Sequence, residues 1–73
     1  MVNDREQVDL SVVLPCYNEI DYLQKAVDNT ENLLKRTSYT YEIIIAEDAS
    51  TDGTDKLAEK LSKERDHIVW MHR

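Results

Sequence analysis

The sequence predicts an α/β fold in which three parallel strands alternate with two helices. Residues 9–14, 41–46 and 67–71 are short apolar runs rich in β-branched residues, and they are typical of buried strands. Residues 20–36 and the segment that begins near residue 50 instead repeat apolar positions every three or four residues, as amphipathic helices do. Strands that alternate with helices pair in parallel through right-handed crossovers, so we expect helices to cover the sheet.

The first strand and the first helix have clear boundaries in the sequence. Residues 9–14 (DLSVVL) end in three apolar residues before Pro15, so we expect a strand that stops there and is buried on both faces. The helix over 20–36 begins with acidic and ends with basic residues, which suits the helix dipole. Its predicted apolar stripe consists of Leu23, Ala26, Val27, Thr30, Leu33 and Leu34.

The second strand, residues 41–46 (YEIIIA), leads into the octet EDASTDGT at 47–54. Within this octet, Ser50 or Thr51 is predicted to cap the second helix. The apolar stripe of that helix consists of Thr54, Leu57, Ala58 and Leu61. Residues 67–71 (HIVWM) predict the third strand.

Composition limits the function classes. A chain of 73 residues is long enough for one small domain, and its net charge of −6 argues against a nucleic-acid binder without excluding a single nucleotide. Cys16 is the single cysteine, so it has no disulfide partner in the chain, which fits a reducing cytosol. The start MVNDREQ is too polar for a signal peptide, and no apolar run approaches the roughly 20 residues of a membrane span.

The octet first raises the question of calcium. From Asp48, the order Asp-x-Ser-x-Asp-Gly reaches Glu59 at the spacing of an EF-hand loop. An EF-hand loop joins two helices, whereas here a strand precedes the loop. Glu59 would also lie inside a helix that has already begun. We therefore reject a calcium site.

Two polar segments, 15–19 (PCYNE) and 47–52, follow the first two strands. Ligands of open parallel sheets bind at the carboxyl ends of the strands, so these segments form the predicted site. A flat base can stack on Tyr17 or lie against Pro15, and the carboxylate of Asp48 can accept a hydrogen bond from a base N–H. A glycine-rich phosphate cradle is missing, so a diphosphate would need a divalent metal or further basic residues.

Each of these residues also has a structural interpretation. Tyr17 would cover the end of the sheet, and Asn18 would form a turn. Asp52 is favoured as a helix cap, and Glu47, which points away from Asp48 by strand alternation, as a structural residue.

At this point the sequence resembles a known family. SVVLPCYNE, followed by EIIIAEDASTDGT, closely resembles the beginning of family 2 glycosyltransferases, and the glutamate of PCYNE is most similar to the dolichyl-phosphate mannose or glucose synthase branch. The resemblance implies part of a Rossmann-like GT-A fold. It also implies that Pro15, Tyr17 and Glu19 line a nucleoside pocket, and that Asp48 hydrogen-bonds the base, which is usually uracil or guanine.

Two residues depart from the family pattern. Glu47 replaces the first aspartate of a pair, and Ala49 replaces a glycine. Because alanine stands in place of the glycine, the turn after Asp48 need not use a positive φ.

The resemblance implies inverting transfer of a hexose from a UDP- or GDP-sugar to a polyprenyl or dolichyl phosphate, with Mg²⁺ or Mn²⁺ as cofactor. The metal-binding Asp-x-Asp of the family follows the third strand and does not occur in residues 1–73. We therefore expect these residues to be the nucleoside-binding half of a single truncated domain, with no catalytic or metal-binding residue and no activity alone. We expect a cytoplasmic location, with any contact to the cytoplasmic face of a membrane made through missing segments.

A non-enzymatic α/β module that binds a ligand or a partner is the alternative. An Asp-x-Asp shortly after residue 73 would favour the enzyme, and failure to bind UDP- or GDP-sugars would favour the module. The first strand should lie in the middle of the complete sheet, so its free edge in this chain predicts self-association.

Overall fold

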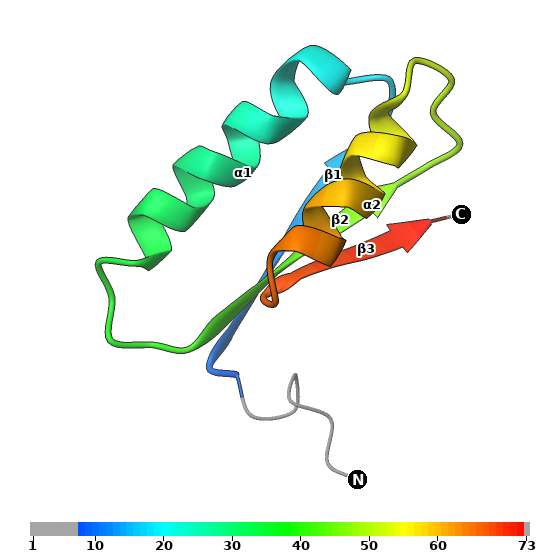
Figure 1. The fold of residues 1–73 in the computed structure, drawn as a ribbon. Coiled ribbons are helices and arrows are strands. Elements are labelled where there is room, and N and C mark those ends of the chain that lie inside the picture. Colours follow the sequence, from blue (N-terminus) through cyan, green and yellow to red (C-terminus); the bar gives the residue numbers. More distant parts are fainter. Residues whose placement is uncertain (1–7, 73) are drawn as a thin grey trace, which may run out of the picture.

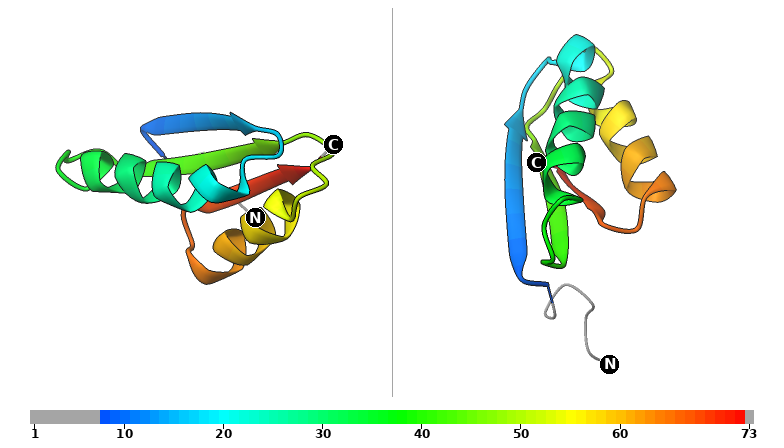
Figure 2. Two further views of the ribbon diagram at one scale, coloured as in Figure 1. Left: turned by 90° about the horizontal axis from the view of Figure 1, so that it is seen from above. Right: turned by 90° about the vertical axis from the view of Figure 1, so that its left-hand side faces the viewer.

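The computed structural model describes residues 8–72 of the chain. Three parallel strands form one sheet in the order β1-β2-β3, and both helices lie on the same face of it (Figures 1 and 2). The elements in chain order are β1 (Leu10–Cys16), α1 (Ile20–Leu34), β2 (Tyr41–Glu47), α2 (Thr54–Glu64) and β3 (Ile68–His72). The predicted class and the predicted order of elements are confirmed.

The core lies between the sheet and the two helices. Ile43 and Ile45 on the central strand β2 are fully buried, as are Val27 of α1 and Ala58 of α2. Burying a side chain such as isoleucine stabilises the fold by roughly 1.5–3 kcal/mol, so these buried side chains hold the helices on the sheet. The predicted stripe of α2 is confirmed in this core.

The prediction that the first strand is buried on both faces is wrong. Both helices cover one face, and on the other face Val13 of β1 and Met71 of β3 are 55% and 56% exposed. An uninterrupted apolar run does not reveal which face is covered, because successive residues point to opposite sides whatever their polarity.

β1 also continues through Pro15 to Cys16 instead of stopping before the proline. The carbonyl of Cys16 accepts the N–H of Asp48 at 3.1 Å, so Cys16 bonds toward β2. By alternation the backbone nitrogen of Pro15 points away from β2, where a missing N–H breaks no ladder bond. The other strands differ from prediction by one residue at their ends.

α1 ends at Leu34 rather than at residue 36, and two predicted stripe residues, Ala26 and Leu33, are exposed. The buried position is taken by Glu31, whose carboxylate bonds to Arg65 and His67 in the connection between α2 and β3. Burial raises the pKa of this carboxyl, but the hydrogen bonds from His67 and Arg65 outweigh it and hold the pKa below its usual value.

The predicted start of α2 is also wrong. The helix begins at Thr54, after Gly53 at φ 97°, and neither Ser50 nor Thr51 caps it. The carboxylate of Asp52 instead accepts the backbone N–H of Thr54 at 3.0 Å. Glycine suits residue 53 because a Cβ there would lie 3.0 Å from Cδ1 of Ile20, and because its φ is left-handed.

Candidate nucleotide site

Two loops meet at the carboxyl ends of β1 and β2, as the parallel register requires (Figure 1). Residues 17–19 follow β1, and residues 48–53 follow β2. The hydrogen bond from Asp48 to Cys16 extends the ladder by one residue and keeps Asp48 beside the end of β1. The two segments singled out in the sequence are therefore neighbours in space.

Asn18 connects the two loops through bonds in both directions. Its N–H donates to Oγ of Ser50 at 2.9 Å, and its side-chain oxygen accepts the N–H of Thr51 at 2.7 Å. Asn18 has a φ of 50°, a conformation that asparagine tolerates better than most residues. Asn18 thus does more than form its own turn, because it holds the two loops at a fixed separation.

Asp52 is a structural residue, as its sequence position suggested. One oxygen accepts from the backbone N–H and the hydroxyl of Thr54, and the other accepts the N–H of Ile20 at 3.2 Å. These bonds, the Thr54 hydroxyl first, hold the pKa of the Asp52 carboxyl below its usual value. Glu19 joins the same junction, since its N–H donates to Oγ1 of Thr54 at 2.9 Å. The first turns of both helices are therefore linked.

Glu47 is fully buried and is also structural, in agreement with the sequence interpretation. Its carboxylate accepts the N–H of Ser50 and contacts Nδ1 of His72 on β3. Burial raises the pKa of this carboxyl, but the bonds from Ser50 and His72 bring the pKa below its usual value. The neighbouring Asp48 is exposed, so the two adjacent acids have different roles.

Ala49 has a φ of 49°. The turn after Asp48 uses a positive φ even though alanine stands there. The N–H of Ser50 donates to the side-chain carboxylate of Glu47, three residues earlier, so the chain reverses direction around Ala49.

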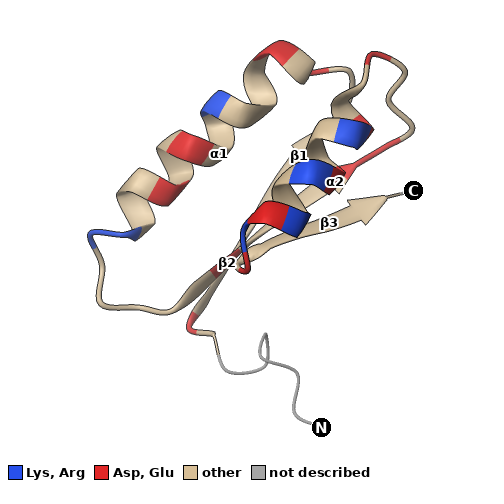
Figure 3. Cartoon of the chain, in the orientation of Figure 1, with Lys and Arg blue, Asp and Glu red and all other residues tan. Residues whose placement is uncertain are grey.

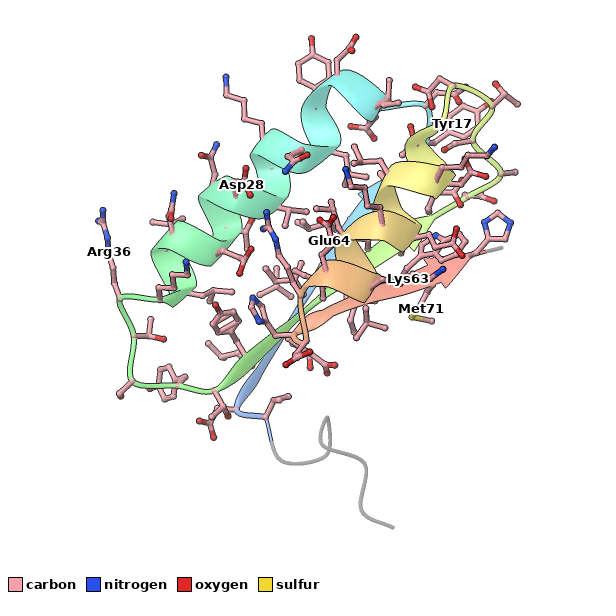
Figure 4. The ribbon with its side chains drawn as sticks, in the orientation of Figure 1. Tyr17, Asp28, Arg36, Lys63, Glu64 and Met71 are labelled. Carbon is pink, nitrogen blue, oxygen red and sulfur yellow. The ribbon has the colours of Figure 1, made fainter. Side chains whose placement is uncertain are left out.

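A pocket of about 440 Å³ lies at this edge of the sheet. All four residues that the resemblance assigns to the nucleotide line it, and Tyr17 stands exposed among the loop side chains (Figure 4). The lining consists of Pro15, Cys16, Tyr17, Glu19, Ala46, Glu47, Asp48 and Met71. The structure therefore brings the predicted site residues together on one cavity, while their binding role stays a prediction.

Sequence reasoning missed Met71 as a lining residue. The sequence could have indicated Met71, because it ends the third predicted strand, and parallel strands end at the same edge of the sheet. The bonds of Asn18 to Ser50 and Thr51 had no such signal, because they join residues more than 30 positions apart.

The loops at the pocket carry acidic residues, whereas the Lys and Arg of residues 8–72 lie on the helices and in the connections at their far ends (Figure 3). Burial raises the pKa of the Cys16 thiol, and the charges of Glu19, Glu47 and Asp52 raise it further. This thiol is therefore protonated at neutral pH and is a poor nucleophile.

Within residues 8–72, no group of three or more His, Cys, Asp or Glu side chains is arranged to hold a metal ion. Glu59, the last residue of the apparent calcium spacing, lies in α2 and pairs with Lys63 at 3.5 Å. In the same part of the chain, no helix is long and apolar enough to cross a membrane.

Comparison with known proteins gives consistent matches. The chain is 37% identical to a dolichyl-phosphate beta-glucosyltransferase of Trichomonas vaginalis over 96% of this chain and 23% of that protein. It is 37% identical to the glycosyltransferase AglD of Haloferax volcanii, over 89% of this chain and 11% of that protein. It is 33% identical to an undecaprenyl-phosphate 4-deoxy-4-formamido-L-arabinose transferase of Proteus mirabilis, over 82% of this chain and 19% of that protein.

The chain thus spans about a quarter or less of the length of these relatives. No solved structure matches it significantly. The family described as Glycosyl transferase family 2 matches residues 11–73, and the three parallel strands with their two crossover helices are part of the Rossmann-like GT-A fold. This chain belongs to glycosyl transferase family 2.

Proposed function

We propose that residues 1–73 form the nucleoside-binding part of a glycosyltransferase that moves a hexose, with inversion, from a UDP- or GDP-sugar to a polyprenyl phosphate. The observation that carries this proposal is the meeting of Pro15, Tyr17, Glu19 and Asp48 on one pocket at the carboxyl edge of the sheet. The names of two relatives, one a dolichyl-phosphate and one an undecaprenyl-phosphate transferase, support the acceptor class.

The pocket suits a base with a ring N–H. Tyr17 is exposed and offers an aromatic face, and the carboxylate of Asp48 is an acceptor without a donor of its own. Uracil and guanine each present a ring N–H at the edge that pairs with other bases, whereas adenine and cytosine present a ring acceptor there. Asp48 would therefore favour uridine and guanosine nucleotides over those of adenosine and cytidine.

Attack by the acceptor phosphate on the sugar does not require a general base from this chain. A polyprenyl phosphate is already an anion, so its oxygen attacks the sugar without strong help from a general base. A divalent metal would stabilise the leaving diphosphate, but the described residues offer no ligand set for it, and we assign no step to a metal here. We expect the chain to bind the nucleotide and to transfer no sugar by itself.

Titration of the chain with UDP, GDP, ADP and CDP, followed by calorimetry, tests this proposal. We expect UDP or GDP to bind more tightly than ADP and CDP. Asp48→Ala should weaken the preferred nucleotide by about ten- to a hundredfold, since a hydrogen bond to a charged group contributes about 1.5–3 kcal/mol. Asp66→Ala, at an exposed acid between α2 and β3, is the matched control.

Two results would reject the proposal. One is that neither UDP nor GDP binds, with or without Mg²⁺ or Mn²⁺. The other is that Asp48→Ala and Asp66→Ala have the same effect, since a general loss of negative charge would then explain both.

A further inference from the structure

Glu47 is a charged residue of the pocket lining that has no role in the proposed contacts with the base. It is fully buried at the end of the central strand. One carboxylate oxygen accepts the N–H of Ser50, and the other lies 2.5 Å from Nδ1 of His72. A buried carboxylate is costly unless it is paired and hydrogen-bonded, so these two partners hold Glu47 in place.

The contacts of Glu47 connect His72 to both walls of the pocket. Asp48 lies between Glu47 and Ser50 in the chain, so the carboxylate of Glu47 closes the turn that carries Asp48. Ser50 also accepts the N–H of Asn18 at 2.9 Å, which extends the connection to the loop after β1. His72 on β3 is therefore connected to both loops through the side chain of Glu47, and its contact with Glu47 can affect the position of both.

The contact between His72 and Glu47 differs with the charge of the imidazole ring. The side chain of His72 is 48% exposed, so its ring is open to solvent. The ring is tilted by 48° against that of Trp70, with centroids 5.3 Å apart. A neutral imidazole can donate one N–H to Glu47. A protonated ring makes a stronger, charge-assisted bond and compensates the buried negative charge.

The surroundings of this pair are acidic. Among the residues that the structure describes, no Lys or Arg lines the pocket, and the lysines of α2, the helix that packs on β3, are exposed. The described titratable groups at the pocket or half-buried on that helix are Cys16, Tyr17, Glu19, Glu47, Asp48, Asp55 and Glu59. A nucleoside diphosphate adds further negative charge, so a proton on His72 would lower the electrostatic cost of binding.

We propose that His72 is a positioning residue of the nucleotide pocket, which acts through Glu47 and favours nucleoside diphosphate binding when it is protonated. This inference rests on the proposed function, because it needs a nucleotide in the pocket. Binding linkage is reciprocal, so the nucleotide in turn favours the proton on His72 by the same factor.

The two histidines of the chain allow a test with an internal control. Nuclear magnetic resonance follows each imidazole ring from about pH 5 to about pH 8.5, with and without saturating UDP or GDP. We expect the nucleotide to raise the midpoint of the His72 titration by the equivalent of about a fivefold coupling. His67, bonded to Glu31 at the other end of β3, should not move.

Variants extend the test to affinity. His72→Gln should remove the part of the pH dependence of the UDP or GDP dissociation constant that is due to the His72 ring, and His67→Gln should leave that pH dependence unchanged. Nucleotide binding without a shift of His72, or with equal shifts of both rings, would overturn the inference and leave the proposed function standing. Absence of binding would reject both. The titration of the wild-type chain decides the matter even where His72→Gln does not fold.

Discussion

At the residue scale, three left-handed residues shape the loops of the site. Asn18 and Gly53 belong to types that accept positive φ, with values of 50° and 97°. Ala49, at 49°, does not. Its Cβ is crowded against the backbone at a cost of roughly 1–2 kcal/mol, which the bonds of Ser50 to Glu47 and Asn18 must offset.

Replacing Ala49 by glycine should therefore stabilise the chain. The relief of strain exceeds the extra entropy of glycine in the unfolded chain, so we expect a gain of roughly 0.5–1 kcal/mol in the free energy of unfolding, measured in urea. Ala26→Gly is the control, because Ala26 is exposed within α1, and the same change there should cost about 1 kcal/mol. Equal losses in both variants would contradict the strained conformation at residue 49.

At the element scale, the helix ends depended on contacts that the sequence does not display. Asp52 bonds to the first residues of both α1 and α2, and α2 begins only after Gly53. Ser50 does not cap α2, although its residue type is a good cap. Ser50 is used by Asn18 of the other loop. Local propensity predicted that a helix exists there, and the pairing of distant loops decided where it starts.

The position of α1 against the connection between α2 and β3 depends on Glu31 in the same way. Arg65 bridges Glu31 and Asp28, with 3.0 Å to Asp28, and His67 completes the cluster. We expect Glu31→Gln to cost about 1–3 kcal/mol of unfolding free energy, because hydrogen bonds to a buried charged group are lost. Glu64→Gln, at the exposed end of α2, should change little and is the control.

The same substitution should alter the response to acid. The folded pKa of Glu31 lies below the unfolded value of about 4.3, so its contribution is fully present above that pH and is lost as the pH falls through the folded pKa. Between about pH 6 and pH 3, the free energy of unfolding should fall less steeply with decreasing pH for Glu31→Gln than for the wild type. An unchanged slope would show that the buried carboxylate is not the acid-sensitive group.

For the whole molecule, the sequence predicted the order of elements and the edge of the sheet that carries the site. Both depend on local periodicity and on the rule that parallel strands end together. Once β1 and β2 are paired, this rule places Asp48 beside Tyr17. Right-handed crossovers place both helices on one face once the strand order is β1-β2-β3, but periodicity does not give that order. Neither periodicity nor the strand-end rule could predict that Asn18 would join the loops. These features depend on which distant surfaces meet.

The free edge of β1 leads to a last prediction. Among residues 8–72, β1 pairs with β2 alone, and Val13 stands exposed on the open face beside that edge. An unpaired apolar edge can take up the same edge of a second copy, so we expect the sedimentation coefficient of the chain to rise with concentration. Val13→Lys should weaken this association, because a lysine beside the edge repels its counterpart. Leu33→Lys, on the exposed side of α1, should not. A chain that stays monomeric at all concentrations, or that responds equally to both lysines, would show that β1 does not pair with a second copy.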